Sequence, residues 1–452
     1  MTTENERAIV LDILIEVLEK KQYSHLVIRQ ALDKYSYLPK QSRGFIDRAA
    51  KGCIEHLLEL DAMINQVSSV KVSKMKPVIR TILRMTAYQM RYMKVPAHAA
   101  CNEAVKLAGM RGFRGLSKFV NGVCRALAAI AVSYDCSGSQ ELYYSMPSSL
   151  LSLFHQWYPD DQVTAMLEAF QNENGRHLYA HFHVNQVPEE TIRSSLEEQG
   201  ISVSEAPYAD HCYRLDGVEK VDGLEAFCRG WIQIQDISSS LAAQCVSPAK
   251  DSCCLDICGA PGGKSVHMAE AMAQTGRVIC RDLSLEKLPR MEENRLRCGL
   301  SNMTAEIWDA RIPREDDAER YDYVLADVPC SGLGVIGRKP DIKYRVTETE
   351  LKELVCLQRE ILTQAAKAVR PGGVLVYSTC TINPDENQGN VQWLLDQGGW
   401  ETESLEPFLH KPVEGADPAC GMLQLLPGQN TCDGFFIARL RKTTGGNLED
   451  RH

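Results

Sequence analysis

The sequence predicts a multi-domain protein: an all-helical domain, a small α+β connector, and an α/β domain built on a doubly wound sheet. Its 452 residues exceed the roughly 100 to 200 residues that one domain usually holds. Apolar residues recur at helical spacing through residues 4–130, where strand signals are scarce. From about residue 235 onward, apolar strand-like runs alternate with helical stretches, which is the rhythm of a doubly wound sheet.

Residues 1–140 form the predicted helical domain. Breaks at Pro39 and Pro96 divide it into several helices, which together indicate a helical bundle. A serine-rich stretch that ends at Pro147 indicates a linker into the next domain. The helical spacing is clearest near the start of the chain, in Ile9, Leu11, Ile13, Leu14, Val17 and Leu18.

Two further domains are predicted after this linker. Residues 141–235 mix short helices with short strands such as LYAHFHVN and CYRLDG, which indicates a small α+β connector. Residues 236–442 hold the strand-like runs of the sheet: SCCLDIC, GRVICRDL, MTAEIWD, YDYVLAD, GGVLVYSTC and GFFIARL. We expect the tail, residues 443–452, to be frayed.

Charge is distributed unevenly along the chain. The formal net charge is −9, from 50 Lys and Arg against 59 Asp and Glu. Residues 1–130 hold 21 of these basic and 11 of these acidic residues, a net +10, which leaves −19 for the remainder. This asymmetry fits a polyanion-binding module joined to a separate domain, and it fits equally a helical bundle with a well-solvated surface.

Neither a metal site nor a membrane span is predicted. The 17 cysteines include no CxxC pair, and the cluster of Cys253, Cys254 and Cys258 lacks zinc-ribbon spacing, so we interpret the cysteines as thiols. No uninterrupted apolar run reaches the roughly 18 residues that a bilayer requires. The N-terminus also lacks the layout of a signal peptide, so we expect a cytoplasmic protein.

A glycine-rich loop stands between an apolar strand and a helix in LDICGAPGGKSVHMAE. Small residues at this place let a backbone approach a ligand near a helix N-terminus, which indicates a nucleotide-like cofactor. A phosphate-binding GxxxxGK[ST] loop is excluded by one position, because Cys258 stands where glycine is required. A tight structural turn is the alternative interpretation of the glycines.

Three aspartates follow predicted strands: Asp282, Asp309 and Asp327. Ligands of an open α/β sheet bind beyond the carboxyl ends of its strands, so we expect these carboxylates to face one crevice. Asp282 has the spacing of an acid that accepts ribose hydroxyls, and Asp309 would reach the adenine side. Helix capping is the alternative for any one of the three.

Two cysteines also follow strands, Cys330 in DVPCSGLG and Cys380 in YSTCTINPDEN. We expect both at the same rim of the sheet. Buried structural cysteine is the common explanation for a lone Cys. It fits these two less well, because each lies in a turn that presents a thiol to a cleft.

Together these motifs resemble the NOL1/NOP2/Sun family of RNA (cytosine-5) methyltransferases, and within it the bacterial RsmB-type branch. The helical segment, with LRMTAYQM and KFVNGVCRAL, resembles the NusB-like RNA-binding domain of that branch. The resemblance covers nearly the whole chain. The motifs that carry it are CGAPGGK, DLSLEKLPRMEENRLRCG, DVPCSGLGVIGRKPDIKY, STCTINPDEN, QDISSSLA and DGFFIARL.

The resemblance implies a NusB-like bundle, a connector for RNA recognition, and a Rossmann-like class I methyltransferase domain. It implies methyl transfer from S-adenosylmethionine to C5 of a cytosine in 16S ribosomal RNA. The substrate would be this RNA itself or an assembling small ribosomal subunit, and the enzyme a monomer. The residues implied to bind the cofactor are Cys258, Gly259, Ala260, Pro261, Gly262, Gly263, Lys264, Asp282, Asp309 and Asp327.

The same resemblance assigns catalytic roles. Cytosine C5 is a poor nucleophile, so a thiolate must first add to C6, and this covalent step is assigned to Cys380. Cys330 would assist breakdown of the adduct. Asp327 is the implied partner of cytosine N3, and Lys264 would orient the base.

Three positions depart from the family pattern. Gly259 replaces an alanine of the glycine-loop motif, and Gly337 and Arg338 replace two arginines that follow the first cysteine motif in the family. We expect neither change to abolish activity. An RVN-like signature of the connector begins with His183. That histidine would either contact RNA or be an ordinary half-buried strand residue.

Two other classes of protein are alternatives to this interpretation. A non-catalytic RNA-binding or antitermination protein with a degenerate methyltransferase domain would not require both cysteines. A methyltransferase for a protein or a small molecule would share the glycine loop and the aspartates, but would have no use for paired thiols. Amino methylation of bases typically uses an Asn/Asp-Pro-Pro-aromatic motif, whereas this chain has Asp327-Val328-Pro329-Cys330.

Overall fold

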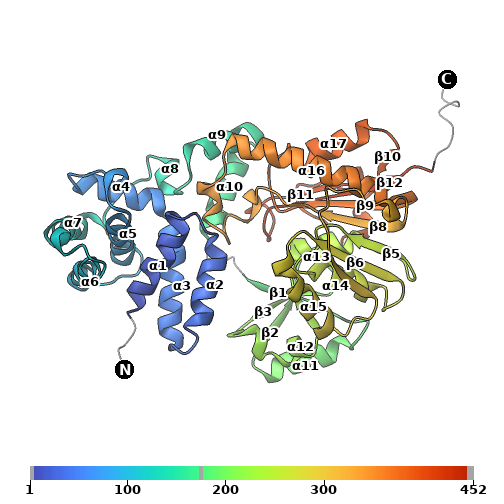
Figure 1. The fold of residues 1–452 in the computed structure, drawn as a ribbon, viewed down its shortest axis with the longest axis horizontal. Helices are drawn as coiled ribbons and strands as arrows, with labels where there is room; N and C mark the ends of the chain where they lie inside the picture. The colour runs from blue at the N-terminus through green and yellow to red at the C-terminus, as the bar shows by residue number, and fades with distance from the viewer. Residues whose placement is uncertain (1–4, 173–176, 445–452) are drawn as a thin grey trace. The chain divides into compact units, whose positions relative to one another are not determined.

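The computed structural model describes residues 5–172 and 177–444 (Figure 1). The chain forms two compact units. The helical unit comprises Met1–Val163 and Ile336–Arg345, and the sheet unit comprises Thr164–Val335 and Val346–His452. Of the tail expected at 443–452, residues 445–452 lie outside the described residues.

The helical unit is a bundle, as the periodicity predicts. Its helices are α1 (Glu6–Leu18), α2 (Ser24–Lys34), α3 (Lys40–Glu55), α4 (Leu57–Val67), α5 (Pro77–Arg91), α6 (Ala97–Met110), α7 (Ser117–Ile130), α8 (Gln140–Tyr143) and α9 (Ser148–Trp157). Helix α10 (Asp160–Gln171) begins in this unit and continues into the sheet unit. The prolines set the boundaries: Pro39 and Pro96 directly precede α3 and α6, and Pro77 opens α5.

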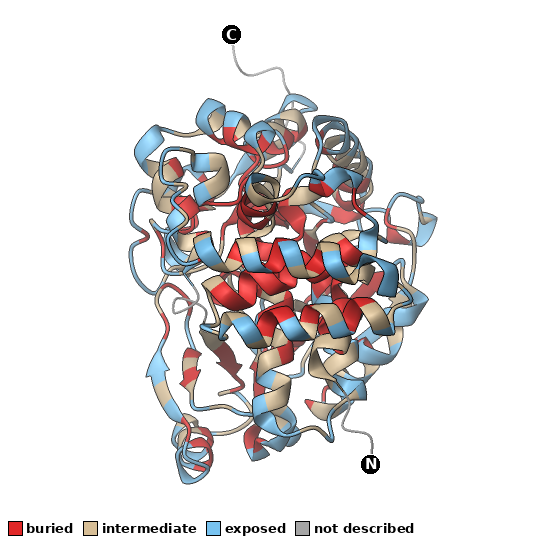
Figure 2. Cartoon of the chain, turned by 90° about the vertical axis from the view of Figure 1, so that its left-hand side faces the viewer, coloured by how far each residue is buried: buried red, intermediate tan, exposed pale blue. Residues whose placement is uncertain are grey.

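Helix α5 forms the centre of the bundle. Every residue from 81 to 90 is buried, and α5 contacts α1, α3, α4, α6 and α7. A helix buried on all sides must pair its polar groups, and Arg84 accordingly donates to Asp61 at 2.6 Å. In Figure 2, buried residues follow the facing sides of neighbouring helices, and exposed residues lie on their outer sides.

The first sheet of the sheet unit is small and antiparallel. Its strands lie in the order β2 (Ser202–Glu205), β3 (Cys212–Asp216), β1 (Leu178–Phe182) and β4 (Ile232–Ile234). Helices α11 (Glu189–Glu198) and α12 (Glu225–Cys228) accompany it, and Ile192 and Leu196 of α11 pack against Phe182. This is the α+β architecture expected for the connector.

The second sheet carries all six strand-like runs of the sequence. Its order is β10-β12-β9-β8-β5-β6-β7, with β11 paired to β12. Pairing is parallel from β9 to β7, whereas β12 lies antiparallel to β9. The strands are β5 (Cys253–Asp256), β6 (Arg277–Asp282), β7 (Met303–Ile307), β8 (Tyr321–Asp327), β9 (Val369–Thr379), β10 (Trp400–Thr402), β11 (Met422–Leu425) and β12 (Phe435–Lys442).

Helices cover both faces of this sheet, which confirms the doubly wound arrangement. Successive residues of a strand point to opposite faces, so Cys254 and Leu255 enter different hydrophobic clusters. Cys254 packs with residues of α13 (Ile237–Gln244), α14 (Gly263–Ala271) and α15 (Leu288–Arg297). Leu255 packs with residues of α16 (Glu348–Ala368) and α17 (Gln388–Asp396).

The predicted division into three domains at residues 140 and 235 stays a prediction. The helical unit continues beyond residue 140 through α8 and α9, and the small antiparallel sheet belongs to the same compact unit as the large one. Within the described ranges, no helix combines the length and the apolar character needed to cross a membrane.

Candidate active site at the carboxyl edge of the parallel sheet

The glycine loop joins β5 to α14. Gly262 precedes α14 with φ of +100°, a left-handed conformation that glycine adopts without strain. At Gly259, a Cβ atom would lie 2.5 Å from Sγ of Cys280 and 2.7 Å from the Asp256 carboxylate. With Cys280 beside it, the loop therefore accommodates only glycine at 259, which is a physical reason for this departure from the family pattern.

Asp256, at the end of β5, lies beneath this loop and was not predicted as a site residue. Its carboxyl group is fully buried, and Oδ2 accepts a hydrogen bond from Ser265 Oγ at 2.6 Å. Among the described residues, Oδ1 has no hydrogen-bond partner. Burial raises the pKa of Asp256 to about 7, and the charges of Asp327 and Asp282 add to this, against the lowering effects of Ser265 and Lys264.

Asp282 is the last residue of β6, and Asp309 follows β7, as the strand pattern predicts. Asp282 Oδ1 accepts from the backbone N–H of Ser284 at 2.9 Å, and the carboxylate pairs with Lys287 at 3.4 Å. Asp309 bonds Arg311 twice, through its backbone N–H and its guanidinium, and this hydrogen bonding lowers the pKa of Asp309. Asp282 also acts electrostatically on Asp256, whereas the described contacts of Asp309 stay within its own turn.

Lys264 and Asp327 form an ion pair beside the cysteines. Nζ of Lys264 lies 2.7 Å from Oδ2 of Asp327, whose Oδ1 accepts from Ser378 Oγ at 2.8 Å. Burial alone lowers the pKa of Lys264, but the charge and hydrogen bond of Asp327, then the charges of Asp256 and Cys380, raise it above its ordinary value. Lys264 is therefore a stable cation, and the charge of Cys380 is among those that act on it.

The structure brings Cys330 and Cys380 together. Their sulfur atoms lie 3.2 Å apart, although 50 residues separate them in the chain. They follow β8 and β9, which pair in parallel with Asp327 opposite Ser378. The hydrogen bond to Cys380, and then burial, raise the pKa of Cys330 well above that of an ordinary thiol.

The two cysteine loops are joined by further hydrogen bonds. The Gly334 N–H donates to the Cys380 carbonyl at 3.1 Å, and the hydroxyls of Ser331 and Thr381 lie 2.6 Å apart. Glu386, fully buried, accepts from the Ser331 N–H at 2.9 Å. Ser331, Thr381 and Glu386 were not predicted as site residues, although all three lie inside the quoted motifs, because the motifs indicate chemistry only for the thiols.

His183 is a buried residue of the connector. Its side chain is fully buried, and its Nδ1–H donates to the carbonyl of Gly230 at 2.7 Å. The following Asn185 donates its backbone N–H to Glu270 of α14 at 2.8 Å. In this structure the His-Val-Asn turn joins the small sheet to α14, and His183 is not presented to solvent.

The described parts of the chain contain no group of three or more His, Cys, Asp or Glu side chains arranged to hold a metal ion.

The glycine loop, the carboxylates at strand ends and the antiparallel strand β12 define a Rossmann-like methyltransferase domain. A family model described as "16S rRNA methyltransferase RsmB/F" matches residues 243–441, and the NusB family model matches residues 4–129.

Known proteins resemble the whole chain. The "Probable ribosomal RNA small subunit methyltransferase B" of Bacillus subtilis (strain 168) is 34% identical over 454 residues, which cover 98% of this chain and 100% of the relative. The chain therefore belongs to the family of 16S rRNA methyltransferases RsmB/F and carries a NusB-family domain. This confirms the resemblance inferred from the motifs.

Solved structures show the same fold. "Crystal Structure of PH0851" matches with a TM-score of 0.81 at 23% identity, over 97% of this chain and 99% of that one. "The crystal structure of NSun6 from Pyrococcus horikoshii with SFG" matches with a TM-score of 0.59 at 23% identity, over 66% of this chain and 99% of that one.

The buried carboxyl group of Asp256 generates a prediction about pH. Its folded-state pKa of about 7 exceeds the roughly 3.9 of an unfolded aspartate, so the folded state binds this proton more tightly. The contribution of Asp256 to the free energy of unfolding therefore falls as the pH rises from about 4 to about 7. Asp256→Asn should remove this contribution, so the thermal unfolding midpoint should fall less with pH than in the wild type.

The exposed variant Asp316→Asn is the matched control, and its unfolding midpoint should follow the wild-type pH dependence. Equal slopes for Asp256→Asn and the wild type would contradict a protonated Asp256.

Proposed function

We propose that this protein transfers a methyl group from S-adenosylmethionine to C5 of a cytosine in 16S ribosomal RNA, through a covalent bond between Cys380 and C6. The observation that carries the proposal is the pair of sulfur atoms 3.2 Å apart beside the Lys264–Asp327 ion pair. Family membership supports the RNA substrate, because the matching family model is described as a 16S rRNA methyltransferase.

The loop before α14 fits this cofactor. Gly262 caps α14 without any side-chain hydrogen bond, so the first N–H groups of the helix are left for an anionic group. Asp282, at the end of the next strand, offers carboxylate oxygens to ribose hydroxyls. The bound cofactor supplies an electrophilic methyl group on a sulfonium. Asp309 would take the adenine side.

Cys380 is the proposed nucleophile. Its thiolate, favoured by the nearby Lys264 cation, adds to C6 of cytosine and makes C5 electron-rich enough to accept a methyl group. Negative charge develops toward N3 of the base during this addition. The Lys264–Asp327 pair holds a transferable proton between two heavy atoms 2.7 Å apart, and it stabilises that charge by hydrogen bonding or protonation.

Cys330 is the proposed release residue. After methylation, the C5 proton must leave and the bond between C6 and the Cys380 sulfur must break. The raised pKa of Cys330 keeps it a neutral thiol before the reaction, in contact with the sulfur that must depart. For release, Cys330 first gives its own proton to solvent, and its thiolate then accepts the C5 proton. The C5–H electron pair becomes the C5–C6 double bond, and the bond from C6 to sulfur breaks to free Cys380 as a thiolate.

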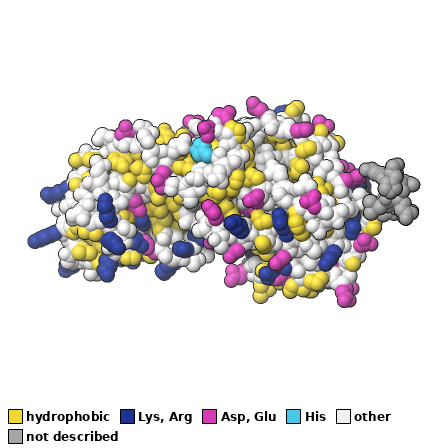
Figure 3. Space-filling view, turned by 90° about the horizontal axis from the view of Figure 1, so that it is seen from above, with side chains coloured by type: hydrophobic (Ala, Val, Ile, Leu, Met, Phe, Trp, Pro, Cys, Tyr) yellow, Lys and Arg dark blue, Asp and Glu magenta, His cyan; other side chains and the backbone are white. Residues whose placement is uncertain are grey.

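The helical unit is the proposed RNA-binding module. Lysine and arginine side chains project from its outer surface at the left of Figure 3, in agreement with the net +10 of residues 1–130. Cationic side chains that displace counterions from phosphates supply most non-specific affinity for RNA. We propose that the protein acts as a monomer on 16S RNA or on an assembling small subunit.

Cys380→Ala should abolish methylation, because it removes the sulfur that attacks C6. We expect a rate below about a thousandth of the wild-type rate, measured as transfer of labelled methyl groups into RNA. Cys356→Ala removes an exposed thiol on α16 and should leave the rate unchanged. Comparable product from Cys380→Ala and the wild type would refute the assignment of the nucleophile.

Cys330→Ala should trap the covalent intermediate. With methylatable RNA and S-adenosylmethionine, a denaturing gel should show a protein–RNA band that is absent for the Cys330→Ala, Cys380→Ala double variant. The control distinguishes a bond to Cys380 from non-specific crosslinking. If the single variant forms no such band while it still binds both substrates, the release role of Cys330 is wrong.

A further inference from the structure

The chain that leaves the Cys330 loop enters the helical unit. Residues Ile336–Arg345, here named the anchor segment, pack with the helices, although the chain before and after them belongs to the sheet unit. Only five residues separate Cys330 from Ile336. The anchor segment contains GRKPDIKY, the last part of the motif DVPCSGLGVIGRKPDIKY that includes Cys330, and the proposed mechanism uses none of the anchor residues.

Asp341 of the anchor segment caps a helix. Asp341, which is 2% exposed, accepts hydrogen bonds from both the backbone N–H and the hydroxyl of Ser24, the first residue of α2. Tyr23 precedes α2 without a side-chain cap, so a carboxylate 317 residues away supplies one. A negative charge at a helix N-terminus is stabilised by the helix dipole.

Lys343, two residues further along the segment, binds helix C-termini. Nζ of Lys343 donates to the carbonyl of Glu55, the last residue of α3, at 2.8 Å, and to that of Tyr144, just after α8, at 3.4 Å. Carbonyl groups at helix C-termini lack partners within the helix and attract cations. Lys343 is 3% exposed, so these contacts are shielded from water.

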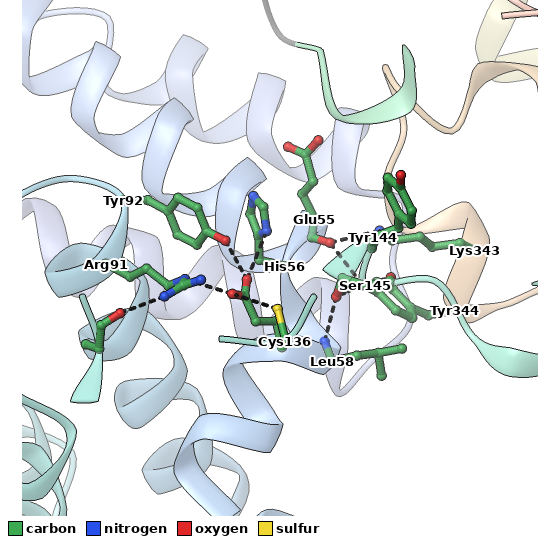
Figure 4. A network of polar contacts seen from close by, with 12 residues as sticks. Glu55, His56, Leu58, Arg91, Tyr92, Cys136, Tyr144, Ser145, Lys343 and Tyr344 are labelled. Atoms are coloured by element: carbon green, nitrogen blue, oxygen red, sulfur yellow. Dashed lines mark hydrogen bonds and ion pairs between the residues drawn. The ribbon is translucent and has the colours of Figure 1, made fainter. Parts of the chain in front are cut away.

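Tyr344 strengthens the same attachment. Its hydroxyl lies 3.1 Å from the Ser145 carbonyl and 3.2 Å from that of Glu55 (Figure 4). Oγ of Ser145 in turn accepts the N–H of Leu58, in the first turn of α4, at 2.8 Å. The anchor segment thus places each charge at the helix end that favours it, an acid at α2 and a base at α3 and α8.

The junction that receives Lys343 and Tyr344 is itself held by a buried network. Glu59 of α4 is 1% exposed, pairs with Arg91 at 2.7 Å, and accepts from the hydroxyl of Tyr92 at 2.5 Å (Figure 4). His56 and Cys136 contact the same carboxylate at 3.3 Å and 3.7 Å. These contacts join residues of α4, the end of α5 and the segment around Cys136 to one buried carboxylate beside the receiving surface.

We propose that Lys343 and Tyr344 are positioning residues for the reaction: their hydrogen bonds to helix ends fix the downstream end of the chain segment that begins at Cys330. The loop is bonded near its start to the Cys380 loop, through Ser331 and Gly334, and ends in the anchor segment. The helical unit then serves adduct release as well as RNA binding. This inference rests on the proposed function.

The test compares the full-length variants Lys343→Met and Tyr344→Phe with the wild type in steady-state methylation of 16S RNA. A small displacement of a catalytic group costs up to about 100-fold in rate, so kcat should fall roughly 10- to 100-fold while KM for RNA is unchanged. The covalent protein–RNA adduct should accumulate on denaturing gels. Lys343→Arg keeps the charge and should recover most of the rate.

Matched controls are Lys352→Met and Tyr37→Phe, which change the same groups at exposed positions and should behave as the wild type. Wild-type kcat in both anchor variants would overturn the inference, and so would a raised KM with unchanged kcat. If Lys343→Met fails to fold, the kcat of Tyr344→Phe, which keeps the aromatic ring, decides whether the inference holds. Failure of the proposed function would appear separately, as absence of 5-methylcytidine with the wild-type protein.

Discussion

The parallel pairing of β8 with β9 is the constraint on which the site depends. Its register sets Asp327 opposite Ser378, so the loops that follow both strands leave the sheet side by side. Cys330 comes three residues after Asp327 and Cys380 two residues after Ser378, which brings their sulfur atoms to 3.2 Å. Hydrogen bonds between the two loops maintain this distance. A slip of one residue would turn the strand's side chains to the opposite face and separate the thiols.

Charge at the site is arranged around Lys264. Its ammonium group pairs with Asp327 and acts on both Asp256 and Cys380. Burial raises the pKa of Asp256 to about 7, so a substantial fraction of this carboxyl is neutral near pH 7 and its negative charge opposes a thiolate less than that of an ordinary aspartate. The two cysteines differ correspondingly: Cys380 is near the cation, whereas Cys330 is a thiol of raised pKa. Under the proposed mechanism, this difference suits Cys380 to attack and Cys330 to assist release.

Periodicity and strand endings predicted much of this arrangement. The helical bundle, the six strands and the meeting of Cys330 with Cys380 all follow from local patterns, because parallel strands end at one edge. Asp256 was not predicted as a site residue, because its burial depends on how the glycine loop folds over it. The anchor segment was also unpredictable, because Asp341 and Ser24 are 317 residues apart and nothing local in GRKPDIKY indicates its helix partners. Asp309 was predicted at its strand end, but its described contacts remain local.

The most direct test of the central claim is nucleoside mass spectrometry of unmodified bacterial 16S RNA, after incubation with the protein and methyl-labelled S-adenosylmethionine. The paired thiols predict labelled 5-methylcytidine, because covalent activation at C6 directs the methyl group to C5. Labelled N4-methylcytidine would contradict the two-thiol mechanism. No label in RNA, despite demonstrable cofactor binding, would contradict 16S RNA as the substrate.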